Sequence, residues 1–292
     1  LPGVFLVVPN RDKGRLPALL CAALGRSDAA PLIPPGPPRP AAPADRARPF
    51  VKIQDGCDGT CTYCIVPRAR GRSRSRTPAD VVATVRTLAE RGASEVVLSG
   101  IHIGRYGHDL TPATDLATLI TALLRNTPVA RLRLSSVEPD ELTPALLAAV
   151  AADRVCPHFH LPLQSGDDAT LRRMGRRYDT AAYAATIRAL VAVRPNAAVG
   201  ADVIVGFPGE DDAGFERTRA FVATLPFTYL HVFAFSPRNG TQAAGFPNRP
   251  PSSVVKARSA VLRRISDERR ARFYAALAGT TADALVEDVS GK

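Results

Sequence analysis

From residue 50 onward, short apolar runs alternate with amphipathic segments, and this alternation limits the possible folds more than any other feature of the sequence. Short apolar runs are typical of buried strands, whereas apolar residues at helical spacing are typical of helices. Strands that alternate with helices favour parallel βαβ units and an α/β fold, either an open doubly wound sheet or a partial barrel. The six predicted strands lie near residues 50–53, 95–99, 131–135, 158–161, 198–205 and 228–234.

The helices between these strands have recognisable start and stop signals. In the first one, Thr77 is placed as an N-cap, Pro78 as the first helical residue and Gly92 as the residue that ends the helix. The other predicted helices lie at residues 142–151, 167–174, 180–193 and 211–224, with a basic amphipathic helix at 253–277.

Changes in composition divide the rest of the chain. The segment Leu1–Val8 is a predicted strand that is too short to span a membrane, and a second strand begins near Ala284. Because the sequence starts without a methionine and ends within a predicted strand, we expect it to be part of a longer protein. The predicted segments are a strand-and-helix unit at 1–30, a proline-rich extended linker at 31–49, the alternating core at 50–242, a loop and basic helix at 243–279, and the start of a further domain at 280–292.

Three cysteines within eight residues form the strongest chemical signal. Cys57, Cys61 and Cys64 have the spacing C-x3-C-x2-C, which can bind three irons of a [4Fe–4S] cluster and leave the fourth iron open to a small molecule. A structural zinc site is the first alternative, but it needs a fourth ligand, and no Cys or His follows before His102. The second alternative is a redox pair formed by Cys61 and Cys64, which would leave Cys57 without a role.

The remaining cysteines and histidines are expected to be structural. Cys21 and Cys156 are predicted to be small buried residues. The histidines at 102, 158 and 160 are predicted to pack or to form hydrogen bonds rather than to bind metal.

The charge favours a polyanionic partner. With 38 basic and 27 acidic residues, the chain carries a formal charge of +11, and nucleic acid is the first candidate for such a surface. Five arginines alternate directly after the cysteines and predict a basic ribbon that binds RNA phosphates; a solvated basic loop is the alternative. These residues are Arg68, Arg70, Arg72, Arg74 and Arg76, with weaker candidates at Arg172, Arg173, Arg176, Arg177 and in the 263–272 helix.

The cysteine loop resembles that of the radical S-adenosylmethionine (SAM) superfamily, and the residues around it resemble the methylthiotransferases within that superfamily. The similarity continues through Leu98–Gly107, Ser135–Pro139, His158–Gly166 and Asp202–Glu210 and covers nearly all of residues 50–242. The segments at 100–107 and 70–76 are most similar to the threonylcarbamoyladenosine tRNA methylthiotransferases.

The resemblance implies a partial (βα)6 radical SAM barrel with its active site at the carboxyl ends of the strands. It implies that Cys57, Cys61 and Cys64 are catalytic as ligands of a [4Fe–4S] cluster whose open iron binds SAM. A second [4Fe–4S] cluster is expected in the family, but its ligands are absent here, because only Cys21 precedes Cys57. Residues 1–30 and 280–292 would then be remnants of an N-terminal α/β domain and of a TRAM-like RNA-binding β-barrel.

Further cofactor-binding residues follow from the resemblance, each with a structural alternative. Tyr63 is expected to contact the adenine of SAM, and the alternative is that it only packs against the loop. Gly100 is expected to lie close to the methionine end of SAM, and the alternative is that it forms a simple turn. Glu138 is expected to bind cofactor or substrate, or else to cap a helix. Asp202 and Gly206 are expected to contact the adenosine, or else to end a buried strand, and Asp202 stands where the family usually has a glycine.

The implied activity is conversion of N6-threonylcarbamoyladenosine at tRNA position 37 to its 2-methylthio derivative, by a cytoplasmic monomer that has no membrane association. The implied partners are a tRNA anticodon stem-loop and a flavodoxin- or ferredoxin-like electron donor. A methylthiotransferase for isopentenyladenosine tRNA or for ribosomal protein S12, a non-catalytic Fe–S RNA-binding fragment and a zinc module remain the alternatives.

Overall fold

Six parallel strands, arranged in chain order, form the centre of the fold in the computed structural model, which describes residues 4–8, 10–25 and 47–286. Strands β1, β4 and β5 form one sheet and β6, β7 and β8 the other. A parallel bridge between Leu132 and Val155 and a 3.0 Å hydrogen bond from Val137 N to His160 O join the two. The strands are β1 (Phe50–Lys52), β4 (Glu95–Ser99), β5 (Arg131–Leu134), β6 (His158–His160), β7 (Ala198–Val205) and β8 (Tyr229–Ala234).

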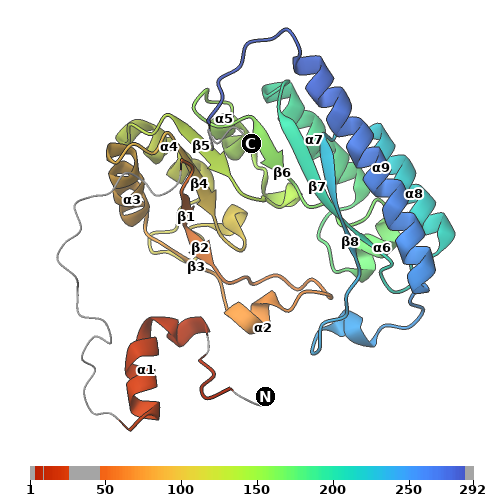
Figure 1. Ribbon diagram of the computed structural model, residues 1–292, viewed down its shortest axis with the longest axis horizontal. Helices are drawn as coiled ribbons and strands as arrows, with labels where there is room; N and C mark the ends of the chain where they lie inside the picture. Colours follow the sequence, from red (N-terminus) through yellow and green to blue (C-terminus); the bar gives the residue numbers. More distant parts are fainter. Residues whose placement is uncertain (1–3, 9, 26–46, 287–292) are drawn as a thin grey trace, which may run out of the picture.

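This order confirms the predicted partial (βα)6 barrel rather than a doubly wound sheet, because each strand lies beside its neighbour in the sequence. Among the described strands, β1 and β8 do not pair, so the barrel is open at that seam. Helices flank the strands on the outside (Figure 1). They are α3 (Pro78–Glu90), α4 (Leu116–Asn126), α5 (Pro144–Val150), α6 (Asp168–Arg173), α7 (Thr180–Val193), α8 (Asp212–Thr224) and α9 (Ser252–Leu277).

Side-chain caps explain where most of these helices begin. At six starts, an Asp or Thr oxygen accepts a hydrogen bond from the backbone N–H three residues later, which satisfies a donor that the helix itself leaves unpaired. The predicted cap at Thr77 is confirmed, with Asp80 N as the donor at 3.2 Å. The other capping residues are Asp115, Thr143, Asp167, Asp179 and Asp211.

The two faces of the strands differ in chemistry. Along β5, Leu132 and Leu134 are buried in the core against the helices, whereas Arg131 and Arg133 project from the opposite face and contact buried Glu95. The inner face of the barrel is therefore lined by charged and polar groups in this region. A site built there can offer hydrogen bonds and charge rather than a purely apolar wall.

Several expectations outside the core were wrong or are untested. Residues 4–8 form no strand, and Phe5 and Val7 are exposed, because no neighbouring strand pairs with them in the described part of the chain. The segment continues into a 3-10 helix (Asn10–Arg15) and α1 (Leu16–Ala23). Residues 284–286 are likewise not a strand, and the rest of that prediction and most of the predicted linker lie outside the described residues. None of the described helices has the length and apolar character that a bilayer span requires.

Candidate functional site

The cysteine loop leaves the barrel after β1 and is closed at its base by a short antiparallel pair, β2 (Gln54–Asp55) and β3 (Arg74–Ser75). Gly56 has a φ of +77°, and a Cβ atom there would lie 2.0 Å from the carbonyl oxygen of Arg72. Only glycine fits this position. The Cys57 N–H then donates to Gly71 O at 3.0 Å, which fixes the start of the loop.

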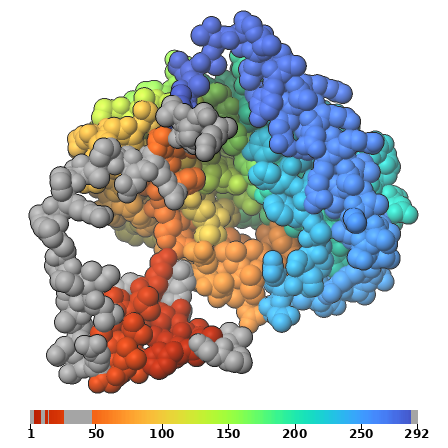
Figure 2. All heavy atoms as spheres, in the orientation of Figure 1, coloured from red at the N-terminus to blue at the C-terminus, as the bar shows by residue number. Residues whose placement is uncertain are grey.

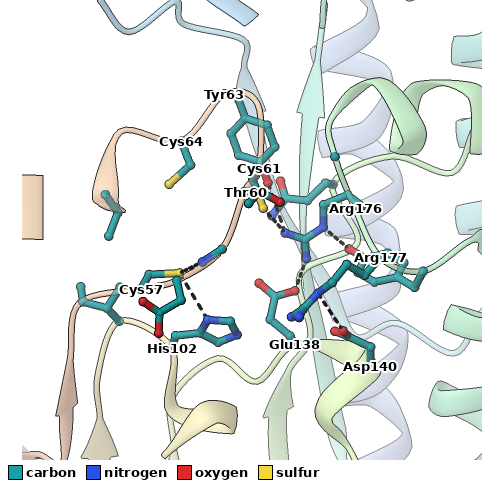
Figure 3. Close-up of a pocket in the computed structure, with 17 residues that line it drawn as sticks. Cys57, Thr60, Cys61, Tyr63, Cys64, His102, Glu138, Asp140, Arg176 and Arg177 are labelled. Carbon is teal, nitrogen blue, oxygen red and sulfur yellow. Dashed lines mark hydrogen bonds and ion pairs between the residues drawn. The ribbon is translucent and has the colours of Figure 1, made fainter. Parts of the chain in front are cut away.

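Cys57, Cys61 and Cys64 line one cavity of about 370 Å³. Their side chains lie around a common open space (Figure 3), and each residue is partly exposed rather than buried in packing. Cys21 and Cys156 are buried elsewhere, as predicted; the Cys156 thiol donates to Glu95 Oε2 at 3.4 Å. Three of the cysteines therefore face a cavity, and the other two are packed in the protein interior.

His102 connects the cysteine loop to the end of β4. The backbone N–H groups of Ile101 and His102 donate to Oε1 of buried Gln54 at 3.1 and 2.9 Å, which holds the two loops together. The His102 ring then lies with Nδ1 3.3 Å from Cys57 Sγ and Nε2 2.9 Å from Glu141 Oε1. His102 was expected only to pack or to form hydrogen bonds, and its position against a cysteine was not predicted.

The contacts of His102 change its own pKa and that of the Cys57 thiol. Burial alone would lower the pKa of His102, but the contacts with Cys57 and Glu141 outweigh burial and raise it to about 10. Burial alone would raise the pKa of Cys57, but the contacts with His102 and with the Gly59 N–H lower it below its usual value. A lowered thiol pKa favours the thiolate, which is the form that binds metal.

Arg176 forms the opposite wall of the cavity. Its Nη1 donates to Cys61 Sγ at 3.3 Å, its Nε donates to the Tyr178 hydroxyl at 3.0 Å, and its Nη2 is paired with Glu138. The guanidinium is buried, with its side chain 5% exposed. From the sequence, Arg176 is only a weak phosphate-binding candidate, because a run of arginines gives no sign of which one points inward.

Two predicted cofactor-binding residues, Tyr63 and Glu138, also line this cavity. Burial raises the pKa of the Glu138 carboxyl above its usual value, and the charge of Arg176 offsets part of that effect. The Tyr63 ring packs edge-to-face against Phe207 with ring centroids 6.4 Å apart. Both residues are placed to contact a molecule in the cavity, and their roles in binding SAM stay predictions.

Asp202 lies on the inner face of β7 and lines a second cavity of about 300 Å³. Its Oδ1 lies 2.9 Å from His160 Nε2 and 3.3 Å from His231 Nδ1. This cavity shares Tyr63 and Gln164 with the cysteine cavity, so the two adjoin. The histidine contacts were not predicted, and adenosine binding by Asp202 stays a prediction.

The two predicted glycines are required for packing. A Cβ atom at Gly100 would lie 2.9 Å from Gln54 O. Gly206 has a φ of +78°, and a Cβ atom there would lie 2.4 Å from Val255 Cγ2 of α9. Neither glycine lines the cysteine cavity, and their proposed contacts with SAM stay predictions.

The arginines after the cysteines lie in different local structures. Arg68 and Arg70 belong to a short helix, α2 (Val66–Arg70), which directly follows Cys64 and places Arg68 Nη1 2.8 Å from Gly240 O. Arg76 is partly buried and donates to Thr84 Oγ1 of α3 at 2.8 Å. Arg68, Arg70, Arg72 and Arg74 are exposed, so their binding to RNA stays a prediction.

Comparisons with known proteins agree with this geometry. The model of the Radical SAM superfamily matches residues 51–222. The chain is 38% identical over 83% of its length to a threonylcarbamoyladenosine tRNA methylthiotransferase MtaB of Rickettsia prowazekii, covering 58% of that protein. It is 37% identical over 82% of its length to a tRNA-2-methylthio-N(6)-dimethylallyladenosine synthase of Clostridium botulinum, covering 54% of that protein. The chain thus spans a little over half the length of these relatives.

Solved structures show the same fold at low sequence identity. Methylornithine synthase aligns with a TM-score of 0.55 at 16% identity, covering 76% of this chain and 63% of that one. Coproporphyrinogen III oxidase of Escherichia coli aligns with a TM-score of 0.54 at 17% identity, covering 81% of this chain and 54% of that one. These alignments support the partial barrel and say nothing of the substrate.

Proposed function

The chain belongs to the radical SAM superfamily, and from this membership we propose that it is the catalytic core of a tRNA methylthiotransferase. The proposed reaction converts N6-threonylcarbamoyladenosine at tRNA position 37 to its 2-methylthio derivative. One structural observation carries the proposal: three cysteines from one loop face a single cavity whose other wall holds polar and charged side chains. Similarity to curated tRNA methylthiotransferases supports the choice of substrate, and a tRNA substrate favours action in the cytoplasm.

The residues present fit a [4Fe–4S] cluster. Three thiol ligands bind three irons and leave one iron for SAM, and none of the described residues around the cavity adds a fourth cysteine. Bound together, the cluster and SAM would supply the 5′-deoxyadenosyl radical chemistry of the superfamily. The protein's own part is to hold the ligands, orient the cofactor and keep water away.

We assign these tasks to named residues. His102 and Arg176 place N–H groups against the sulfur atoms of Cys57 and Cys61, where they stabilise negative charge. Tyr63 and Glu138 are proposed to bind SAM directly from the cavity wall. Gly100, Asp202 and Gly206 are the weaker proposed cofactor contacts, because they lie outside this cavity.

The proposal also names partners. The exposed arginines Arg68, Arg70, Arg72 and Arg74 lie just beyond the cysteine loop and are proposed to contact phosphates of the anticodon stem-loop. We propose a flavodoxin- or ferredoxin-like electron donor and a monomeric protein. Within this sequence, Cys21 and Cys156 are the only other cysteines, so we expect this chain alone to cleave SAM without inserting sulfur.

The first test is anaerobic reconstitution with iron and sulfide, followed by reductant and SAM and by measurement of 5′-deoxyadenosine. We expect about four irons per chain and product formation that is lost in Cys61→Ala. The matched control is Cys156→Ala, which removes a buried cysteine outside the cavity and should keep both iron and product. Iron binding without 5′-deoxyadenosine would favour the non-catalytic Fe–S fragment.

A zinc module is the alternative that the geometry also permits. His102 provides a nitrogen 3.3 Å from Cys57 Sγ, and its other nitrogen is paired with Glu141, an arrangement typical of zinc-bound histidines. Metal analysis of the protein as isolated distinguishes the zinc module from the iron–sulfur enzyme. Stoichiometric zinc that survives iron–sulfur reconstitution would favour the module.

A further inference from the structure

Arg177 is the exposed arginine of the cysteine cavity. Its side chain is 50% exposed, whereas the side chain of the neighbouring Arg176 is 5% exposed and is paired with Glu138 beside Cys61. The described residues that line this cavity include no other arginine and no lysine. Arg177 is therefore the arginine that a ligand arriving from solvent meets first.

The contacts of Arg177 leave one edge of its guanidinium free. Its Nε atom lies 3.3 Å from Asp140 Oδ2 (Figure 3), and its Nη2 atom lies 3.5 Å from Glu141 Oε1. Both distances exceed the length of about 2.7–2.9 Å that is typical of a charge-assisted hydrogen bond. The Nη1 atom has no partner among the described residues. Because the N–H groups of a guanidinium form a fixed planar fork, the Nη1 edge can bind a further carboxylate.

The two acidic neighbours do not depend on Arg177. Oε1 of Glu141 also lies 2.9 Å from His102 Nε2 and 3.3 Å from Arg105 Nε. Asp140 is exposed, so water can hydrate its carboxylate. A movement of Arg177 toward a ligand would therefore leave no buried carboxylate without a partner, which is the costly outcome when an ion pair is broken.

The proposed substrate has an anion that fits this free edge. The N6-threonylcarbamoyl group ends in a carboxylate, whereas the isopentenyl group of the alternative substrate is uncharged and apolar. In adenine, C2 and the N6 substituent flank the same ring nitrogen, N1. A base whose C2 faces the cofactor therefore carries its N6 substituent into the same cavity. A carboxylate that enters the cavity needs a cation, because an unpaired charge is costly to remove from water.

The RNA itself is expected beside the cysteine loop. The exposed arginines that we propose for its phosphates belong to residues 68–74, which directly follow the cysteines. Figure 2 shows α2 and the residues next to it, in orange, on the surface of the molecule. A base from an RNA bound there enters the cysteine cavity from solvent, and Arg177 is the exposed cation on the cavity wall.

We propose that Arg177 binds the carboxylate of the threonylcarbamoyl group and so selects this substrate over adenosines whose N6 substituent is uncharged. This inference rests on the proposed function, because it assigns a contact to the substrate of that reaction. SAM also carries a carboxylate, but Arg176 already supplies a cation beside Cys61, where the cluster would bind. The exposed arginine is thus left for the substrate.

The test uses the reconstituted 292-residue chain with SAM and without reductant, so that SAM is not cleaved. Two fluorescein-labelled anticodon stem-loops differ only at position 37, where the threonyl group ends in a carboxylate in one RNA and in the neutral carboxamide in the other. Fluorescence anisotropy measures both affinities. We expect the unchanged chain to bind the carboxylate RNA about tenfold more tightly, and Arg177→Gln to bind the two RNAs equally. Because the two RNAs share every phosphate, the ratio of their affinities is independent of general charge effects.

Arg105→Gln is the matched control, because Arg105 contacts the same Glu141 oxygen but does not line the cavity. It should keep the preference for the carboxylate RNA, and Arg177→Lys should keep part of it. Thermal unfolding should show that all variants remain folded. Equal affinity of the unchanged chain for the two RNAs, or no binding of either, would overturn this inference. An equal weakening of both RNAs in Arg177→Gln would also overturn it and assign Arg177 to a phosphate.

Equilibrium dialysis with SAM tests the other source of a carboxylate. Arg177→Gln should bind SAM as tightly as the unchanged chain does. A loss of SAM affinity, with the preference between the RNAs retained, would overturn the inference and assign Arg177 to the methionine carboxylate. A chain that prefers the carboxylate RNA through Arg177, yet forms no 5′-deoxyadenosine when reductant is added, would overturn the proposed catalytic function alone.

Discussion

The Nδ1 atom of His102 lies 3.3 Å from the Sγ atom of Cys57, although 45 residues separate them in the chain. Buried Gln54 makes this contact possible, because its side-chain oxygen accepts hydrogen bonds from the backbone at 101 and 102. The end of β4 thus carries an imidazole to the edge of the cysteine cavity. An N–H group at a cluster sulfur stabilises the reduced, more negative cluster and so affects its reduction potential.

We therefore predict that His102→Ala keeps its iron but has a more negative reduction potential, by tens of millivolts. The midpoint is measured by an EPR-monitored redox titration of the reconstituted protein. His108→Ala is the control, because His108 is exposed and contacts Arg105 rather than a cysteine. Loss of iron from His102→Ala would show instead that His102 is itself a metal ligand.

The second prediction concerns the ion pair between Arg176 and Glu138. Arg176→Met leaves the Glu138 carboxylate in a cavity wall without its cation, and we expect a loss of about 3 kcal/mol in the free energy of unfolding. Arg176→Lys should not restore stability, because one ammonium group cannot contact Cys61, Glu138 and Tyr178 together. Urea denaturation measures the free energy of unfolding of both Arg176 variants. Adding Glu138→Gln to Arg176→Met should recover part of the loss, and no recovery would contradict the ion-pair explanation.

The third prediction is a pH dependence that comes from Glu95. Burial alone would raise the pKa of this carboxyl, but its contacts with Arg133 and Arg131 outweigh burial and lower it to about 2. Because the folded-state pKa is below the unfolded value of 4.5, the unfolded chain takes up the proton first, and the stabilisation is lost as the pH falls from about 5 toward 2. Glu95→Gln should therefore be less stable than the unchanged chain by about 3 kcal/mol at pH 7. The difference should shrink as the pH approaches 3, and a difference independent of pH would contradict the assignment to the Glu95 charge.

The parts of the fold that could be predicted from sequence are those with local signals. The strand–helix alternation from residue 50 onward and the cap at Thr77 depend on neighbouring residues, and the structure confirms both. Helix α4 was not predicted, although Asp115 caps it. The strand expected at Leu1–Val8 is not formed over residues 4–8, the part of it that the structure describes, because apolar residues make a strand only when another strand pairs with them.

The candidate site was predictable only where its residues are close in the sequence. The three cysteines belong to one loop, and their spacing alone indicates a shared ligand. His102, Arg176 and Gln54 reach the same site from three separate segments, and a single histidine, arginine or glutamine has no sequence pattern that marks it. Their roles depend on the order of strands in the barrel, which brings the strand ends together.

The last prediction separates two roles of Asp202. If Asp202 mainly holds the histidines of β6 and β8, Asp202→Ala leaves the buried His160 ring without its acceptor and should cost about 1–3 kcal/mol in unfolding free energy. Asp202→Asn, which keeps an acceptor oxygen, should cost less, and His231→Ala should cost least because His231 is exposed. Both Asp202 variants should retain iron, since Asp202 does not line the cysteine cavity.

SAM affinity, measured by equilibrium dialysis on the reconstituted protein, distinguishes this structural role from adenosine binding. Unchanged affinity in Asp202→Asn, together with the stability order above, assigns Asp202 to the histidine contacts. A large loss of affinity in Asp202→Asn, with stability unchanged, would instead place the cofactor's adenosine in the second cavity.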